Sequence, residues 1–516
     1  MKYNQLKIGT VLSYVQMGLN IILNLVYTPI MIRLLGQNEY GLYQTVTSTI
    51  SMLTILSLGF NAGYIRFFSI YKERQEQESI YKLNGLFLIL FSFIGVVALG
   101  CGLFFTFHLE LVFSSGFTNI EYDLARVLMA LLTVNLTLTF PMSVFQMIIT
   151  ANERFIILKL IGMLKTVCSP LISIPLLLMG YHSIALVTVT VVISFVTDIL
   201  YLYYVLAILK ERFLFHGFEK GLFKNLFVYT SFIAMNIFVD QVNQNIDKVL
   251  LGRYQGTAET AVYSVGFTVY YLYQVLSSSI SSVFTPRIHG IVARTSDNVQ
   301  AMRQRLTELF IKVGRIQYLI LALIATGFIF FGKPFILYYW AGNGFDDSYI
   351  VALLLILSGT IPLIQNLGIE MQRAQNRHQF RSVIYIVMAG INLVLSIYLC
   401  QLYGAIGCAM GTAISYLLAN GLAMNIYYHK KCNINILAFW KNILKMSQGL
   451  IIPIACGILI NICFDLKNIF IFLLGITIYI VVYGFFVWKL SMNMFEKELI
   501  LTPIRQYRTK ERDGRI

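Results

Sequence analysis

The stretch NIFVDQVNQNIDK, Asn236–Lys248, interrupts an otherwise apolar run of the sequence with a line of polar side chains. These residues recur at steps of three and four, so on a helix they share one face. Unpaired polar and ionised groups are costly in hydrocarbon, so such a face cannot point at lipid. We therefore expect it to line a protein interior or a water-filled cavity. Its members are Asn236, Asp240, Asn243 or Gln244, and Asp247.

A matching polar line lies on the first apolar run of the chain. It consists of Ser13, Gln16, Asn20, Asn24 and Tyr27. An offset of 216 positions places Asn20 on Asn236 and Asn24 on Asp240. An offset of 224 aligns residues 123–204 with residues 347–428 without a gap. Because an even number of crossings restores the direction of the chain, this duplication predicts a parallel repeat of two lobes with a cavity between them.

Composition places the chain in a membrane. Hydrophobic residues make up 58% of the sequence and charged residues 12%, and the mean hydropathy is +0.73. A soluble protein of this size has no means of covering so much apolar surface. The apolar runs are about 20 residues or longer, which suits helical crossings and not the alternating strands of a barrel. The predicted fold class is all-α integral membrane, with about 14 transmembrane helices.

The predicted spans define the expected domains. They are 8–32, 40–68, 83–107, 123–150, 156–180, 182–209, 225–251, 259–286, 311–339, 348–372, 382–403, 405–428, 446–464 and 469–490. The first six belong to an N-terminal lobe at 1–224, and the next six to a C-terminal lobe at 225–445. Helices 13 and 14, at 446–490, have no counterpart in the repeat, and a basic cytoplasmic tail follows at 491–516.

The charge distribution predicts the orientation. With the N-terminus inside, the inner connections hold most of the 39 Lys and Arg residues, and only Arg33, Arg253, Lys333 and Lys467 lie outside. This asymmetry predicts that both termini are cytoplasmic. The net charge of +15 then serves orientation and contact with anionic membrane lipids, and we expect no nucleic-acid partner. The Cys and His residues show no metal-ligand spacing, so no cofactor is expected.

Four stretches carry a family resemblance. They are RLLGQNEYGLYQTVTS (Arg33–Ser48), SLGFNAGYIRFFSIYKE (Ser57–Glu73), GNGFDDSYIVALLLIL (Gly342–Leu357) and YGAIGCAMGTAIS (Tyr403–Ser415). They resemble the polysaccharide-export flippases, which are lipid-linked oligosaccharide flippases of the multidrug/oligosaccharidyl-lipid/polysaccharide exporter superfamily. The resemblance implies two six-helix lobes that form a V around a central cavity, plus two extra C-terminal helices.

The resemblance also implies a function. Such proteins pass an undecaprenyl-pyrophosphate-linked oligosaccharide repeat unit across the cytoplasmic membrane by alternating access, for capsule, exopolysaccharide or O-antigen synthesis. A polysaccharide polymerase and glycosyltransferases are then possible partners. The transport needs no covalent chemistry, so the chain is not expected to be an enzyme. A water-filled cavity lets the sugar cross while the lipid tail stays in the membrane.

Cationic and amide side chains are the candidate substrate-binding residues. Arg66 and Arg287 fall near equivalent inner ends of their spans and are predicted to grip the diphosphate, or else to snorkel into the headgroup layer. Lys248 either contacts substrate or neutralises the adjacent Asp247. Cavity lining is predicted for Asn20, Asn24 and Asn236, with hydrogen bonding between helices as the alternative.

Two carboxylates are candidates for ion coupling. Asp240 lies in the middle of its span on the polar line and is predicted to exchange a proton or bind Na⁺. Asp198, in the sixth span, is a weaker case of the same kind. For both residues the alternative is a structural carboxylate paired across the cavity. Glu370 and Arg373, three residues apart, are expected to pair with each other.

Other functions remain open on the same sequence. A cation-coupled multidrug exporter of the same superfamily would use Asp240, Asp247 and nearby tyrosines as an acidic, aromatic pocket. A lipid-linked peptidoglycan precursor is a third possible cargo. A membrane polysaccharide polymerase or glycosyltransferase would need acids or arginines on sizeable outer loops. The outer connections here are short, and the longest is at roughly 108–122.

Overall fold

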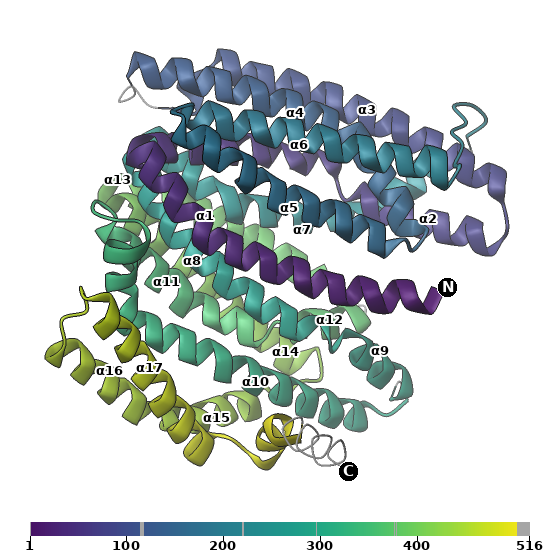
Figure 1. Cartoon of the computed structure of the whole chain (residues 1–516). Helices are drawn as coiled ribbons and strands as arrows, with labels where there is room; N and C mark the ends of the chain where they lie inside the picture. Colours follow the sequence, from purple (N-terminus) through teal and green to yellow (C-terminus); the bar gives the residue numbers. More distant parts are fainter. Residues whose placement is uncertain are drawn as a thin grey trace, which may run out of the picture. The chain divides into compact units, whose positions relative to one another are not determined.

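The computed structural model describes residues 2–113, 118–218, 221–295, 297–375, 377 and 379–502. Throughout these residues the regular structure is helical and contains no strand, which confirms the all-α fold class (Figure 1). Ten of the described helices are long and apolar enough to cross a membrane, or eleven if the bent helix α7 counts as one span. The chain is therefore a multi-pass membrane protein, and the count of fourteen crossings stays a prediction.

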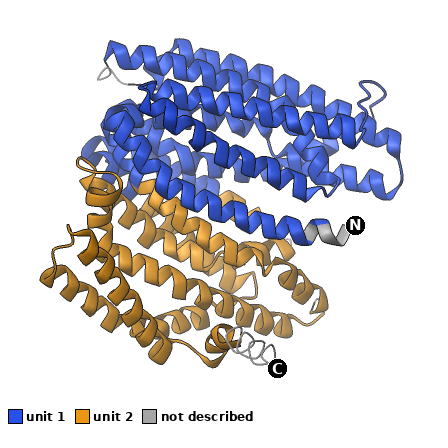
Figure 2. Ribbon diagram, in the orientation of Figure 1, with its two compact units in different colours: residues 1–265, 385–411 blue, residues 266–384, 412–516 orange. Residues whose placement is uncertain are grey.

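The helices fall into two compact units (Figure 2). Unit 1 holds Met1–Val265 and Tyr385–Gly411, and unit 2 holds Gly266–Ile384 and Thr412–Ile516. These units are defined by contacts within the folded chain, whereas the expected lobes at 1–224 and 225–445 are defined by sequence duplication. The lobe boundaries therefore stay a prediction.

Unit 1 is built from seven long helices and parts of two more. They are α1 (Lys2–Met52), α2 (Phe60–Glu73), α3 (Gln77–Phe107), α4 (Asn119–Ala151), α5 (Phe155–Leu178), α6 (His182–Tyr203) and α7 (Leu222–Tyr254), with the start of α8 (Thr257–Ser282) and the middle of α13 (Gln379–Tyr416). Helix α4 packs on α3 and α6, and α5 packs on α1 and α6. Helix α1 also contacts α7.

Two glycines bend helices that are otherwise continuous. Gly36 in α1 has φ of 76°, and Gly404 in α13 has φ of 54°, a region that favours residues without a Cβ. The bends fall between the first and second and between the eleventh and twelfth predicted spans. After Gly404 the chain resumes a helix, and the Ala405 N–H donates to Glu259 Oε2 at 2.7 Å. Helix α1 therefore holds the first predicted span and the start of the second, and α13 holds the eleventh and the first half of the twelfth.

The second predicted span, 40–68, is not one helix. Leu58 and Gly59 are both left-handed, with φ of 45° and 69°, so the chain breaks between the 3₁₀ turn η1 (Leu53–Ser57) and α2. An α-helix has no room for two consecutive left-handed residues. Helix α2 therefore starts afresh at Phe60, and its orientation is set by its own packing.

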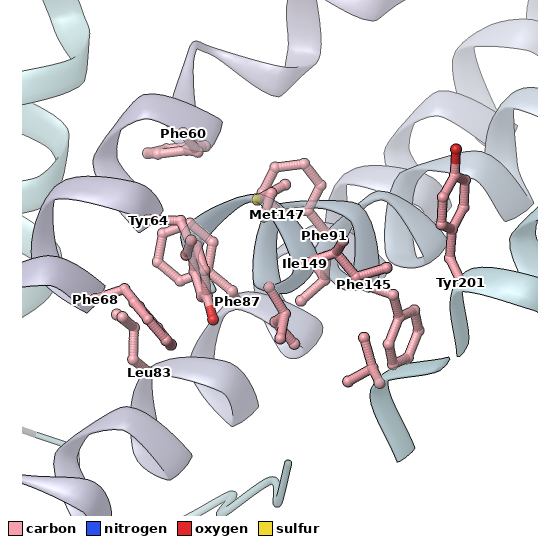
Figure 3. Close-up of a cluster of buried hydrophobic side chains, with 14 of the residues drawn as sticks. Phe60, Tyr64, Phe68, Leu83, Phe87, Phe91, Phe145, Met147, Ile149 and Tyr201 are labelled. Atoms are coloured by element: carbon pink, nitrogen blue, oxygen red, sulfur yellow. The ribbon is translucent and has the colours of Figure 1, made fainter. Parts of the chain in front are cut away.

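An aromatic core in unit 1 holds α2 in place (Figure 3). Phe60, Tyr64 and Phe68 lie on one face of α2 and pack with Phe87 and its neighbours on α3. The Tyr64 and Phe87 rings meet edge to face at 5.0 Å, and the Tyr64 hydroxyl donates to Asn84 Oδ1 at 2.6 Å. Because these residues recur every three to four positions, Arg66 falls off the buried face and is exposed.

Unit 2 is arranged around the long helix α10 (Val299–Pro334). Its other elements are the rest of α8, the two ends of α13, α9 (Thr285–Arg294), α11 (Asp346–Ile364), α12 (Leu367–Ala374), α14 (Asn425–Lys430), α15 (Ile436–Ser447), α16 (Ile451–Cys463) and α17 (Ile469–Phe486). Helix α10 contacts α9, α11, α12, α15, α16 and α17. Side chains on every side of α10 are therefore placed by neighbours from the same unit.

Candidate functional site

Helix α5 covers part of the polar line of α1. Gln16 lies so close to α5 that a Cβ at Gly162 would come within 2.9 Å of its Nε2. Tyr27 lies close to the buried Ser173 of α5. Between them, Asn20 is exposed and Asn24 is half-buried, with its Nδ2 donating to the Asn20 carbonyl at 2.8 Å. The two asparagines thus mark the section of the line that α5 leaves uncovered, and their role as cavity lining stays a prediction.

The polar line of α7 also has two sections. Asp247 is 2% exposed, and the Tyr263 hydroxyl of α8 donates to its Oδ2 at 2.6 Å. The adjacent Lys248 donates to Gln44 Oε1 of α1 at 3.5 Å. Farther along the same face Asn236 is half-buried and Asp240 is exposed. The end near Lys248 therefore contacts α1 and α8, and exposure increases along the face toward Asp240.

Arg66 projects from the exposed face of α2. Its guanidinium lies over the Tyr229 ring of α7, with Cζ 4.3 Å from the ring centroid. Stacking of this kind holds the plane of the guanidinium while its N–H groups stay at the edge, where they can bind a phosphate oxygen. The sequence does not reveal this partner, because Tyr229 is far away in the chain and on a different helix.

Asp198 is a buried charge in unit 1. Its side chain on α6 is 6% exposed and lies close to the Gln146 side chain of α4. The Lys165 ammonium of α5 acts on it electrostatically from beyond ion-pair distance. Sequence reasoning proposed Asp198 and missed Lys165 as its neighbour. A usable signal was that both charges lie in the middle of consecutive apolar spans.

Arg287 lies in unit 2, on the short helix α9. It lines a cavity of about 460 Å³ between α9 and α10. The structure therefore places Arg66 and Arg287 in different compact units, each with its own surroundings. The cavity also includes Arg294, Arg305 and Lys312, which sequence analysis had treated only as orientation signals.

Two further charged pairs belong to the scaffold of unit 2. Arg373 and Glu370 form the expected pair at 2.6 Å, which confirms that prediction. Arg315 and Glu496 form a buried pair, 2.6 Å from Nε to Oε1 and 2.9 Å from Nη2 to Oε2, that sequence reasoning missed. Nowhere in the described ranges do three His, Cys, Asp or Glu side chains gather as metal ligands.

Comparison with known proteins identifies the family. Residues 6–292 match the family described as "Polysaccharide biosynthesis protein". Among solved structures, the lipid II flippase MurJ in an inward closed conformation superposes with a TM-score of 0.71 at 17% identity, covering 96% of this chain and 99% of that one. No curated protein sequence matches the chain.

Two multidrug-type structures are similar over somewhat less of the chain. An inward-facing multidrug resistance MATE family transporter of the MOP superfamily has a TM-score of 0.60 at 13% identity, covering 82% of this chain and 96% of that one. A MOP superfamily transporter from Pyrococcus furiosus, described as having a binding pocket of reverse polarity, has a TM-score of 0.51 at 14% identity with the same coverage. The chain belongs to the polysaccharide biosynthesis protein family and shares the all-helical fold of the MOP superfamily.

Proposed function

We propose that the protein is a flippase that moves undecaprenyl-pyrophosphate-linked oligosaccharide repeat units across the cytoplasmic membrane by alternating access. The observation that carries this proposal is the family match over residues 6–292, joined to a fold similar to a lipid II flippase over 96% of the chain. In this proposal both termini are cytoplasmic, and the polymerase and glycosyltransferases of the same polysaccharide are the functional partners.

Arg66 is the proposed diphosphate-binding residue of unit 1. It is exposed, stacked on Tyr229 and free of any ion pair within the described residues. A diphosphate needs charge-assisted donors, and a guanidinium supplies two in one plane. Arg287 is proposed for the same role in unit 2. Asn20, Asn24, Asn236 and Lys248 are proposed to contact the sugar or its linkage.

Asp240 is the proposed coupling residue, with Asp198 as the second candidate. Asp240 is exposed on the polar face of α7, where a bulk ion can reach it. Asp198 of α6 is buried beside Gln146 of α4 and interacts electrostatically with Lys165 of α5. A change in its charge would therefore alter the interactions among these three helices. A carboxyl that gains an ion on one side of the membrane and releases it on the other couples transport to the ion gradient, which supplies the energy.

A cation-coupled multidrug exporter is the second candidate function. The similarity in fold to a MATE transporter and the exposed acid Asp240 favour it. Organic cations need an acidic, aromatic surface, whereas a diphosphate needs cations such as Arg66. The two functions therefore predict opposite sensitivities at these two residues.

The test is translocation in proteoliposomes that carry an undecaprenyl-pyrophosphate-linked oligosaccharide, followed by exposure of the sugar to an added glycosidase. Arg66→Gln should slow translocation by about ten- to a hundredfold, the cost of one charge-assisted hydrogen bond. Arg126→Gln is the matched control, since Arg126 is an exposed arginine of unit 1 that pairs with Asp123 at 3.7 Å. Asp240→Asn should remove the dependence on an imposed H⁺ or Na⁺ gradient.

The same preparations distinguish the alternatives. Undiminished translocation by Arg66→Gln would refute the role of that residue in binding diphosphate. A wild-type protein that leaves the lipid-linked sugar in place but exports organic cations, with loss in Asp240→Asn, would replace the flippase proposal by the multidrug one. If Asp240→Asn keeps its full gradient dependence, coupling does not run through this carboxyl.

A further inference from the structure

The cavity between α9 and α10 gathers unusual charge for its size. It measures about 460 Å³ and is lined by Pro286, Arg287, Gly290, Ile291, Arg294, Arg305, Glu308, Leu309 and Lys312. Four of these side chains are cations and one is an acid. The volume falls within the roughly 300–1,000 Å³ of small-molecule sites. All of it lies within unit 2.

Helical periodicity explains why the cations face one space. On α9, Arg287 and Arg294 are seven residues apart, with Gly290 and Ile291 between them on the same face. On α10, Arg305 and Lys312 are likewise seven apart, on either side of Glu308 and Leu309. The basic faces of α9 and α10 therefore line the same cavity. Each face has one apolar residue at its centre.

Glu308 is the one acid among the lining residues, so the cavity keeps a net charge of three. In the part of the chain that the structure describes, Arg287, Arg294 and Arg305 form no ion pair. Lys312 is held over the Phe495 ring, with Nζ 3.3 Å from the centroid, and this contact does not neutralise it. Like charges gathered in this way repel one another. A bound anion removes that repulsion and gains charge-assisted hydrogen bonds.

The place of the cavity along α10 indicates where the anion comes from. No Asp, Glu, Lys or Arg occurs from residue 316 to residue 332, a stretch of about 26 Å that matches the hydrocarbon core. Lys312 and Arg305 precede that stretch by about 6 Å and about 16 Å along the helix. The cavity therefore lies at the level of the lipid headgroups, where phosphate is the abundant anion.

We propose that this cavity binds the phosphate group of a membrane lipid through Arg287, Arg294 and Arg305. Lys312 lies at the edge of the cavity that is nearest to the charge-free stretch of α10. The site extends the proposed role of Arg287 from a single residue to a four-cation pocket. Two lipids supply this chemistry: an anionic phospholipid and the undecaprenyl-pyrophosphate carrier. Only the second source rests on the proposed flippase function.

Gly290 gives the proposal a test that leaves all charges in place. A Cβ built at Gly290 meets nothing within 4 Å, and Gly290 lines the cavity, so a larger side chain has open space to extend into. Gly290→Leu should therefore occupy part of the site and preserve the fold. Arg294→Gln combined with Arg305→Gln removes two donors instead. Arg303→Gln is the matched control, because Arg303 is an exposed arginine of the same helix that does not line the cavity.

The experiment measures lipid retained by the purified full-length protein, by native mass spectrometry, in three arms. The arms contain phosphatidylglycerol, undecaprenyl pyrophosphate and inorganic pyrophosphate, with phosphatidylcholine as the background lipid. Wild type and Arg303→Gln should bind at least one of the two lipids. Gly290→Leu and the double variant should bind it at least tenfold more weakly, and added salt should weaken the wild-type complex.

Each outcome is decisive. Equal binding by all four proteins, or no lipid binding by wild type, would overturn the proposal. Binding of inorganic pyrophosphate without either lipid would overturn the assignment to a lipid. Selective binding of phosphatidylglycerol supports a phospholipid site even if translocation fails, so the failure of the flippase proposal stays distinguishable. Unchanged elution on size exclusion and unchanged helical circular dichroism show that each variant is folded.

Discussion

Arg315 and Arg305 lie on the same helix of unit 2, about three turns apart, yet they meet opposite environments. Arg315 is 5% exposed, makes two hydrogen bonds to Glu496, and donates through Nη2 to the Ser491 carbonyl at 2.9 Å. Arg305 is exposed in a basic cavity with no ion pair among the described residues. The difference shows that a charge beside a membrane span serves the fold when its donors are used internally, and is available for binding when they are not.

The acids of α7 in unit 1 also differ in burial. Asp247 is buried against Tyr263, whereas Asp240, seven residues earlier on the same face, is exposed. One polar line therefore has a buried end and a more exposed section. Substitutions at the structural positions should lower stability. Substitutions at the open positions should alter binding and transport.

The largest effect is expected at the buried ion pair. Arg315→Ala leaves the Glu496 carboxylate buried without its partner, which should cost about 3–5 kcal/mol of unfolding free energy. The control is Arg373→Ala, whose pair with Glu370 has the same 2.6 Å distance but is exposed on the arginine side, so about 0–1 kcal/mol is expected. Thermal unfolding in detergent measures both. Equal loss in the two variants would remove the distinction between the buried and the exposed pair.

The sequence predicts much of this fold because its signals are local. Run length predicts the apolar helices, and the bends at Gly36 and Gly404 fall where span boundaries were expected. The pair of Glu370 and Arg373 followed from spacing on one helix. The break at Leu58 and Gly59 was missed because hydropathy is continuous through it, although left-handed φ values interrupt the backbone.

The candidate site is less predictable because its contacts join distant residues. Arg315 and Glu496 are 181 residues apart, and no local pattern connects them. Tyr229 beneath Arg66 and Lys165 near Asp198 come from other helices in the same way. The cavity between α9 and α10 is intermediate in how far the sequence predicts it. The seven-residue spacing of its cations is visible in the sequence, but only the fold makes the two faces meet.

A smaller effect is expected where a buried hydrogen bond is removed from Asp247. Tyr263→Phe deletes the hydroxyl that donates to Oδ2, and a hydrogen bond to a charged group is worth about 1.5–3 kcal/mol. Tyr203→Phe is the control, because Tyr203 is an exposed tyrosine of the same unit. Chemical unfolding of the two variants gives the comparison. An unchanged stability for Tyr263→Phe would mean that the α7–α8 end of the polar line is not a structural contact.

The smallest effect is expected at the exposed pair His108 and Glu110, in the connection between α3 and α4, where Nδ1 and Oε1 are 3.1 Å apart. The pKa of Glu110 is lowered first by its own backbone N–H and then by His108. A lowered carboxyl pKa contributes stability that is present above the ordinary value and is lost as the pH falls through the lowered value.

Glu110→Gln should therefore differ from wild type only marginally at pH 7, and the difference should vanish as the solution is acidified. His108→Gln should change even less, because the larger cause, the backbone N–H, remains. Melting temperatures of the three proteins from pH 7 down to pH 3 measure this. The comparison of buried and exposed charges assumes that exposure decides how much an ion pair contributes to stability. A loss of stability in Glu110→Gln as large as that in Arg315→Ala would show that this assumption is wrong for this protein.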